Sequence, residues 1–129
     1  MSEFYNLVEE ICLQDKRYKP DAYEFVLGGL GFTQKKLKKI THVTGVQLAL
    51  GLRDYAINQY GALAGRVLSH WGINQTQDFG NIVFSMIEKK LLSKTEEDSL
   101  LDFDAVYDFK AAFSNVLADS VIEGFKSKK

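Results

Sequence analysis

The sequence predicts a mainly α-helical protein, a compact single-domain bundle of about six helices. One reason is size, because 129 residues with 46% apolar side chains can bury a core without disulfide bonds or metals to hold it. A second is that apolar residues recur at the 3.6-residue period of a helix along most of the chain. A third is that capping residues and the single proline stand where such helices would begin. We therefore expect one helical domain over residues 1–125 and a frayed basic tail over 126–129.

The first two helices are predicted from their apolar stripes. We expect the first over residues 3–15, with four apolar residues on one side: Phe4, Leu7, Val8 and Ile11. The second begins at Pro20, whose fixed φ suits a first turn, and its stripe comprises Tyr23, Val26, Leu27 and Leu30. We expect the helix to be weakened and then ended by three glycines: Gly28, Gly29 and Gly31.

A capping box marks the start of the third helix. Thr44 and Gln47 have the spacing of this motif, which predicts a helix from residue 45 to about Tyr60. This helix is apolar on two sides, so we expect it to be central in the bundle or covered by a second subunit. Gly61 ends it, and a short helix over 62–70 is expected to turn four apolar residues inward: Leu63, Val67, Leu68 and Trp71.

The strongest helical pattern lies between residues 71 and 92. We expect most of this segment to form the buried helix around which the bundle is organised. Its apolar stripe contains Phe79, Ile82, Val83, Met86, Ile87 and Leu91. Thr76 or Asn74 is expected to cap the first turn, and Asp78 stands where the helix dipole favours an anion.

The segment 92–109 has the least regular pattern. We expect a short β-hairpin or extended pair there, with a helical turn as the alternative. A short helix, a turn at Gly72, a longer helix and an extended pair have the order of a winged helix-turn-helix. Asp108 is then expected to cap a final helix over 109–125.

The net charge of −1 conceals a segregation of charge along the chain. Residues 1–15 carry acids and no base, residues 16–94 carry an excess of lysine and arginine, and residues 95–109 carry acids alone. Such blocks either pair with each other in the fold or present separate faces to partners. The pattern leaves both possibilities open.

Cysteine use and hydropathy indicate a location. The single cysteine, Cys12, excludes an internal disulfide and fits a reducing compartment. No apolar run approaches the ~18 residues that a membrane span needs. The first residues lack the basic and apolar regions of a signal peptide. We therefore expect a cytoplasmic protein with no membrane contact.

The motifs of catalysis and cofactor binding are weak or missing. The run Gly29-Leu30-Gly31 lacks the third glycine and the preceding strand of a phosphate-binding loop. Asp102, Asp104 and Asp108 lack the glycine and the closing glutamate of a calcium loop. We expect no enzyme activity, no cofactor and no metal, and we assign no catalytic residue.

Several segments together resemble a known group of proteins. They are R-Y-K-P-D-A-Y-E-F-V (17–26), H-V-T-G-V-Q-L-A-L-G-L-R-D-Y-A (42–56), W-G-I (71–73), D-F-G-N-I-V-F (78–84), L-L-S-K-T-E-E-D-S (91–99) and F-D-A-V-Y-D-F (103–109). In their order and spacing, the chain resembles a family of small uncharacterised bacterial proteins. The resemblance implies no activity, cofactor or catalytic residue for any position here. The lysine-rich stretch 35–39 departs from the family pattern.

The function that these observations favour is a non-catalytic helical interaction module, assembling with itself or with a protein partner. It is favoured by the two-sided apolar helix 45–60, the surplus of aromatic residues and the opposed charge blocks. The candidate partner-binding residues, chosen by charge and position, are Arg17, Tyr18, Arg53, Asp54 and Trp71.

The alternative is a nucleic-acid-binding protein of winged helix-turn-helix type. Its contacts to phosphates would come from Lys35, Lys36, Lys38, Lys39 and Lys94. The outward positions of the helix that would enter a groove are nearly neutral, whereas a recognition helix is basic. Nucleic acid is therefore the less favoured partner.

Overall fold

The computed structural model describes residues 2–38, 43–92 and 100–113. They form α1 (Ser2–Gln14), α2 (Pro20–Leu37), α3 (Gly45–Tyr60), α4 (Ala64–His70) and α5 (Thr76–Glu88), with two 3₁₀ turns, η1 (Gly61–Leu63) and η2 (Leu100–Phe103). A further helical stretch begins at residue 109 and continues to 113, the end of the described part. The predicted mainly α fold is confirmed, and no strand occurs in these three ranges. The expected helix beyond 113 and the tail lie outside them.

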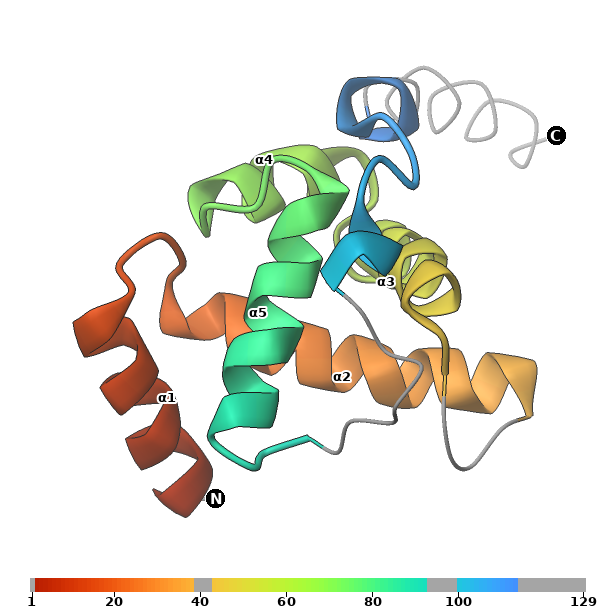
Figure 1. The fold of residues 1–129 in the computed structure, drawn as a ribbon. Helices are drawn as coiled ribbons and strands as arrows, with labels where there is room; N and C mark the ends of the chain where they lie inside the picture. Colours follow the sequence, from red (N-terminus) through yellow and green to blue (C-terminus); the bar gives the residue numbers. More distant parts are fainter. Residues whose placement is uncertain (1, 39–42, 93–99, 114–129) are drawn as a thin grey trace, which may run out of the picture.

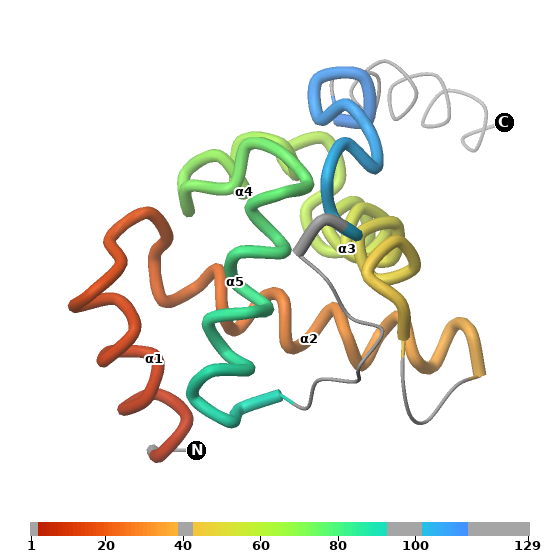
Figure 2. The backbone as a smooth tube through the Cα atoms, in the orientation of Figure 1, coloured from red at the N-terminus to blue at the C-terminus, as the bar shows by residue number. Residues whose placement is uncertain are grey.

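α5 is the central helix, as the periodicity predicts. In Figure 1 it crosses in front of α2, with α1 on one side and α3 on the other, and the tube in Figure 2 follows the same path. It packs against α2, α3 and η2. Four members of its predicted stripe are buried, and Ile87 and Leu91 are partly buried against the same core. The buried four are Phe79, Ile82, Val83 and Met86.

The cap predicted for α5 is wrong. Thr76 is already the first helical residue, and the Asn74 side chain turns back to the Gly72 carbonyl at 3.5 Å. The buried Thr76 hydroxyl instead donates to the Phe103 carbonyl at 2.6 Å and accepts the Val106 N–H at 3.1 Å. A residue chosen for its local capping ability therefore holds a distant segment against α5.

α2 does not end at its glycines. It runs to Leu37, where Lys38 adopts a left-handed conformation with φ 58° and closes the helix. Gly29 lies directly beneath the buried Leu52 of α3, and the Thr33 hydroxyl donates to the Gly29 carbonyl at 2.7 Å. Packing of this kind offsets the low helix propensity of glycine, which the local pattern could not show.

The start of α3 agrees with the prediction. The Gln47 N–H donates to the Thr44 hydroxyl at 3.1 Å, and the Thr44 N–H donates to the Gln47 side-chain oxygen at 3.0 Å. The helix ends at Tyr60 as expected. Of its two apolar sides, one is buried through Leu48 and Leu52, while the other remains partly exposed.

Two leucines predicted to face inward are exposed. Leu63 is 57% exposed because it lies in the turn η1, which precedes α4 and directs the Leu63 side chain outward. Ala64, the first residue of α4, takes the buried position. Leu27 is 37% exposed because the buried side of α2 centres on Ala22 and Val26 instead. Neither rotation can be deduced from the 3.6-residue period alone.

The described part of 92–109 contains a 3₁₀ turn and bends in place of the expected hairpin. Its polar groups are satisfied by other helices, since Thr76 bonds two of its backbone groups and the Tyr107 hydroxyl donates to the Ala49 carbonyl at 3.0 Å. A partner strand is therefore not required for this part of the chain. Asp108 caps the next helical turn as predicted, accepting the Ala111 N–H at 3.3 Å.

Candidate functional site

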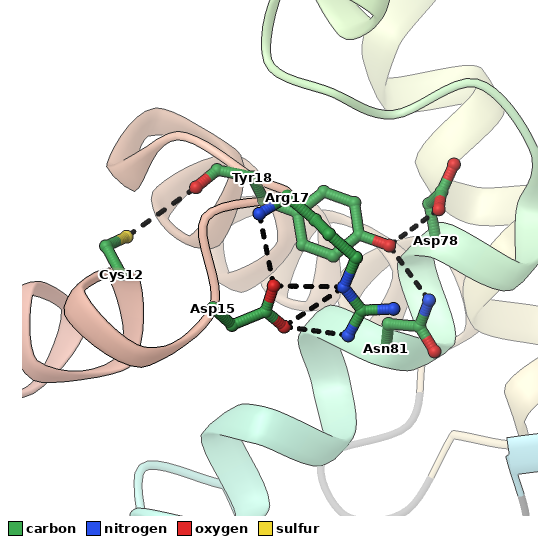
Figure 3. A network of polar contacts seen from close by, with 6 residues as sticks. All are labelled: Cys12, Asp15, Arg17, Tyr18, Asp78 and Asn81. Carbon is green, nitrogen blue, oxygen red and sulfur yellow. Dashed lines mark hydrogen bonds and ion pairs between the residues drawn. The ribbon is translucent and has the colours of Figure 1, made fainter.

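Tyr18 joins the loop between α1 and α2 to the start of α5 (Figure 3). Its ring is buried, and its hydroxyl donates to Asp78 Oδ1 at 2.6 Å and accepts from the Asn81 side-chain amide at 2.8 Å. The second Asp78 oxygen accepts the backbone N–H groups of Asn74 at 2.8 Å and Gln75 at 3.1 Å. One carboxylate thus fixes both the loop and the beginning of the helix, at the dipole position that the sequence indicates.

The environment of Tyr18 keeps its hydroxyl protonated. Burial raises the pKa of Tyr18 to about 12, the hydrogen bond to Asp78 adds to the rise, and the bond from Asn81 opposes it. At neutral pH the group therefore acts as a hydrogen-bond donor to a carboxylate. Tyr18 is only 3% exposed, so it holds the loop against α5, and its role in partner binding stays a prediction.

Arg17 stands above this network at the surface. Its Nε and Nη2 atoms reach the two Asp15 oxygens at 2.9 and 2.7 Å, and its guanidinium lies 5.2 Å from the centroid of the Tyr18 ring. Hydrogen bonds from Arg17 lower the pKa of Asp15. The Arg17 side chain is 58% exposed, so it can contact a partner.

Cys12 lies behind the same loop. Its thiol donates to the Tyr18 carbonyl at 3.6 Å. Burial raises the pKa of the thiol, and the charges of Asp15 and Glu9 raise it further. The neutral thiol is a poor nucleophile, which supports the view of Cys12 as a small apolar residue beside the core.

Arg53 and Asp54 lie on α3, away from the loop between α1 and α2 that contains Arg17, which we call the Arg17 loop (Figure 1). Asp54 accepts from Lys36 at 2.6 Å and from Arg53 Nε at 3.1 Å, and the Arg53 guanidinium lies 5.7 Å from the Tyr107 ring centroid. Partial burial alone would raise the pKa of Asp54, but the hydrogen bonds from Lys36 and Arg53 outweigh it and lower that pKa. This predicted pair therefore ties α2 to α3.

Five aromatic rings in mutual contact form what we call the aromatic surface. Phe25 is at its base, with ring centroids 5.6 Å from Trp71 and 5.1 Å from Tyr55. Trp71 also lies 5.8 Å from Tyr60, and Tyr55 lies 5.2 Å from Phe32. Phe25 is buried and the other four are partly exposed, with Tyr60 at 36%. The row of rings runs from the end of α4 along the junction of α2 and α3.

The chain after α4 places Trp71 beside the Arg17 loop. The Lys19 N–H donates to the Trp71 carbonyl at 3.1 Å. Gly72 has φ 94°, and a Cβ there would lie 2.1 Å from the Arg17 carbonyl oxygen, so only glycine fits this approach. The structure thereby brings together Arg17, Tyr18 and Trp71 of the predicted set and leaves Arg53 and Asp54 elsewhere.

Tyr55 and Tyr60 belong to the aromatic surface but were not among the predicted binding residues. The signal that could have found them is the two-sided apolar pattern of their helix, with Tyr55 on one side and Tyr60 on the other. Burial raises the pKa of Tyr60, and the negative charges of Asp21 and Glu24 also contribute to that rise. Two exposed acids thus border the surface.

The lysines of the nucleic-acid alternative do not form one described cluster. Lys35, Lys36 and Lys38 lie at the end of α2, and Lys36 is paired with Asp54. Lys39 and Lys94 fall outside the described residues.

The helix order of a helix-turn-helix is present, but α5 is not a free recognition helix. Its Asp78 and Asn81 side chains are engaged by Tyr18. Near its other end, Lys89 pairs with Glu10 of α1 at 3.8 Å. Part of the face that would enter a groove is therefore engaged by α1 and the loop that follows it.

Two shallow hollows flank the start of the final helical turn, with volumes of about 440 and 470 Å³. Both are lined by Asn74 and Phe109, one extending along α4 through Arg66 and the other toward Asp104. Throughout the part of the chain that the structure describes, no three His, Cys, Asp or Glu side chains come together to hold a metal ion. The hollow along α4 is lined mainly by apolar groups, whereas the hollow toward Asp104 is lined mainly by polar ones.

No protein-family model matches the chain, and comparisons with curated proteins and with solved structures gave no match either. Membership of the family that the sequence resembles stays a prediction. Within the described ranges, every helix is too short or too polar to cross a bilayer.

Proposed function

We propose that the protein is a non-catalytic helical interaction module that binds a protein partner through the aromatic surface and the neighbouring Arg17. The observation that carries the proposal is the row of contacting rings, of which four reach water. Trp, Tyr and Arg are the residues that contribute most often to binding energy at protein interfaces. Here Trp71 and Tyr60 are in contact, and the backbone of Arg17 passes close to Gly72, the residue after Trp71.

The rings are already held in place before a partner arrives. Trp71 contacts both Phe25 and Tyr60, and its backbone carbonyl accepts a hydrogen bond from the Arg17 loop. Side chains fixed in this way lose little conformational entropy on association. The exposed Leu63, one turn beyond Tyr60, extends the apolar area.

The charges around the surface define the chemistry of the partner. Asp21 and Glu24 are exposed beside Tyr60. A partner that presents lysine or arginine next to apolar side chains would pair with these acids and place a cation near the rings. We therefore infer a partner with a basic rim.

The test is site-specific photocrosslinking in cells of the species that encodes the chain. Tyr60 is replaced with p-benzoylphenylalanine, and the control replaces Leu13, which is 74% exposed on α1. We expect an adduct of discrete mass from position 60 that disappears when Trp71→Ser is added, and none from position 13. If the variant with the photoreactive residue at position 60 folds, as verified by circular dichroism, and gives no adduct, the proposal is contradicted.

The nucleic-acid alternative receives less support. Asp54 neutralises Lys36, and α1 with its following loop engages part of α5. Binding of short DNA or RNA at micromolar protein concentration and low salt, measured by fluorescence anisotropy, would support the nucleic-acid alternative.

Location and family membership are further parts of this proposal. We place the protein in the bacterial cytoplasm, because one half-buried cysteine fits a reducing compartment. Cell fractionation with an antibody to the chain tests the location.

A further inference from the structure

The outer side of α2 carries an ordered series of residues, which we call the outer seam. It consists of Asp21, Glu24, Gly28, Gly31, Lys35 and Lys38. The spacing of i, i+3, i+7, i+10 and i+14 keeps the first five on one stripe of the helix, and Lys38 follows as the left-handed residue that closes α2. All six are exposed. The stripe lies opposite the buried side that centres on Ala22, Val26 and Gly29. Acids occupy one end of the seam, lysines the other and glycines the middle.

The glycine at the middle of the seam has no explanation within the chain. A Cβ on Gly31 would meet no atom within 4 Å. Glycine in a helix interior costs about 1 kcal/mol relative to alanine, so its presence at an open position calls for another reason. Gly28 differs, because a Cβ there would lie 2.7 Å from the Tyr55 hydroxyl, so it is Gly31 that leaves open space for a second helix.

The charges of the seam are complementary to the same seam turned end to end. In an antiparallel pair centred between Gly28 and Gly31, Glu24 lies opposite Lys35 of the second copy, about 8 Å along the axis from the centre. Asp21 lies opposite Lys38 at about 13 Å from the centre. The twofold axis repeats each pair, so the two helices exchange four pairs of opposite charge.

These charges are available for a second copy. None of the four charged residues of the seam forms an ion pair with another residue in the described ranges. The charge of Glu24 and a hydrogen bond between its side chain and the Tyr5 hydroxyl raise the pKa of Tyr5, so a second copy would share Glu24 with this group of α1. Lys36, which does form an ion pair, points to Asp54 on α3 and is not part of the seam.

We propose that the partner is a second copy of this chain, bound through antiparallel pairing of the outer seams. This inference rests on the proposed function and names its partner, since the lysines of the second copy form the basic rim beside the acids. Leu27 and Phe32 lie at opposite edges of the seam and add apolar area beside it. Phe32 belongs to the aromatic surface, so the two surfaces are continuous.

Charge exchange tests the pairing. Sedimentation equilibrium of the full chain is expected to show a dimer that weakens as salt is added. Glu24→Lys and Lys35→Glu alone each place like charges opposite one another twice, so each should raise the dimer dissociation constant roughly tenfold or more. The double variant restores opposite charges and should regain dimerisation. Glu88→Lys and Arg66→Glu, on exposed positions of α5 and α4, are the matched controls and should leave the constant unchanged.

A second variant tests the close approach of the helices. Gly31→Gln adds a polar side chain where the single chain has open space, so the monomer should fold as well or better. The same side chain would keep two seams apart, and the dimer should be lost. A dimer unaffected by Gly31→Gln and by the charge exchanges would overturn the inference, as would a wild-type monomer at all concentrations.

The outcomes separate this inference from the proposed function. A monomer in sedimentation, together with a Trp71-dependent crosslink from position 60 to a different protein, rejects the second copy and retains the interaction module. A dimer that depends on the seam, with a crosslink between two copies, supports both.

Discussion

The inner and outer sides of α2 contain the same residue type for different reasons. On the inner side, a Cβ added to Gly29 would lie 2.2 Å from Leu52 Cδ2. On the outer side, a Cβ added to Gly31 would meet nothing within 4 Å. The inner glycine therefore admits a neighbouring helix of the same chain, and the outer glycine leaves room for something that the chain itself does not supply.

This difference separates the part of α2 that builds the fold from the part through which we propose that the protein binds. The buried side contacts α3 and α5 through small and apolar residues. The outer side is charged at both ends and has two glycines in the middle, of which Gly28 lies against the Tyr55 hydroxyl and Gly31 faces open space. Substitutions on the two sides should consequently change stability in opposite directions.

The largest loss of stability is expected where α3 meets the inner side of α2. A Cβ in Gly51→Ala would lie 1.9 Å from Thr33 Oγ1 and 2.7 Å from its Cγ2, atoms of a short, buried side chain with no room to move. We expect the free energy of unfolding to fall by roughly 3 kcal/mol, measured by urea denaturation. A change below about 1 kcal/mol would show that the helices slide apart easily.

Gly29→Ala should have a smaller effect on the same side. The clash is with the end of the Leu52 side chain, which is flexible but fully buried. We expect a loss of roughly 1–2 kcal/mol, because alanine's better helix propensity offsets part of the strain. Thermal unfolding measures it, and an increase in melting temperature would remove the distinction between the two sides.

Gly31→Ala should change the stability of the monomer in the opposite direction to Gly29→Ala. The added methyl group has open space in the single chain, so the monomer is expected to gain about 0.5–1 kcal/mol from helix propensity. The measurement is urea denaturation at a concentration low enough for monomer alone. Destabilisation comparable to that of Gly29→Ala would mean that the outer side is covered by the chain itself.

Asp54→Asn, on α3 where Asp54 pairs with Lys36 of α2, should have the smallest effect on stability. The pKa of Asp54 is lowered in the folded protein, so its charged pairs with Lys36 and Arg53 stabilise the fold above the unfolded pKa of about 4. That contribution disappears as the pH falls through the lower folded pKa. We expect a loss of about 0.5 kcal/mol at pH 7 that vanishes once the pH lies below the folded pKa. A difference that persisted in acid would assign the effect to packing.

Local patterns predicted the features that depend on neighbours in sequence. The capping box of Thr44 and Gln47 and the buried stripe of α5 required only spacing and residue type. The continuation of α2 past its glycines depended on Leu52, more than twenty positions away, and the role of Thr76 depended on Phe103. No local rule contains such contacts.

The candidate site was predicted in part for the same reason. Arg17 and Trp71 were chosen singly, and their proximity follows from the close passage of Gly72 against the Arg17 carbonyl. Tyr60 joins them only through ring contacts between helices. Charge and residue type can mark candidates, whereas their grouping requires the tertiary fold.

The most direct test of the outer seam is carbodiimide coupling of the wild-type protein followed by peptide mass spectrometry. This reagent joins a carboxylate to an amine in contact with it and adds no spacer. Glu24 and Lys35 of one chain stand about 16 Å apart along the helix, so they cannot be joined within it. The account predicts a Glu24–Lys35 crosslink between copies, shown by mixing ¹⁴N- and ¹⁵N-labelled chains. Coupling at other sites without this product, in a sample at dimer-forming concentration, would contradict it.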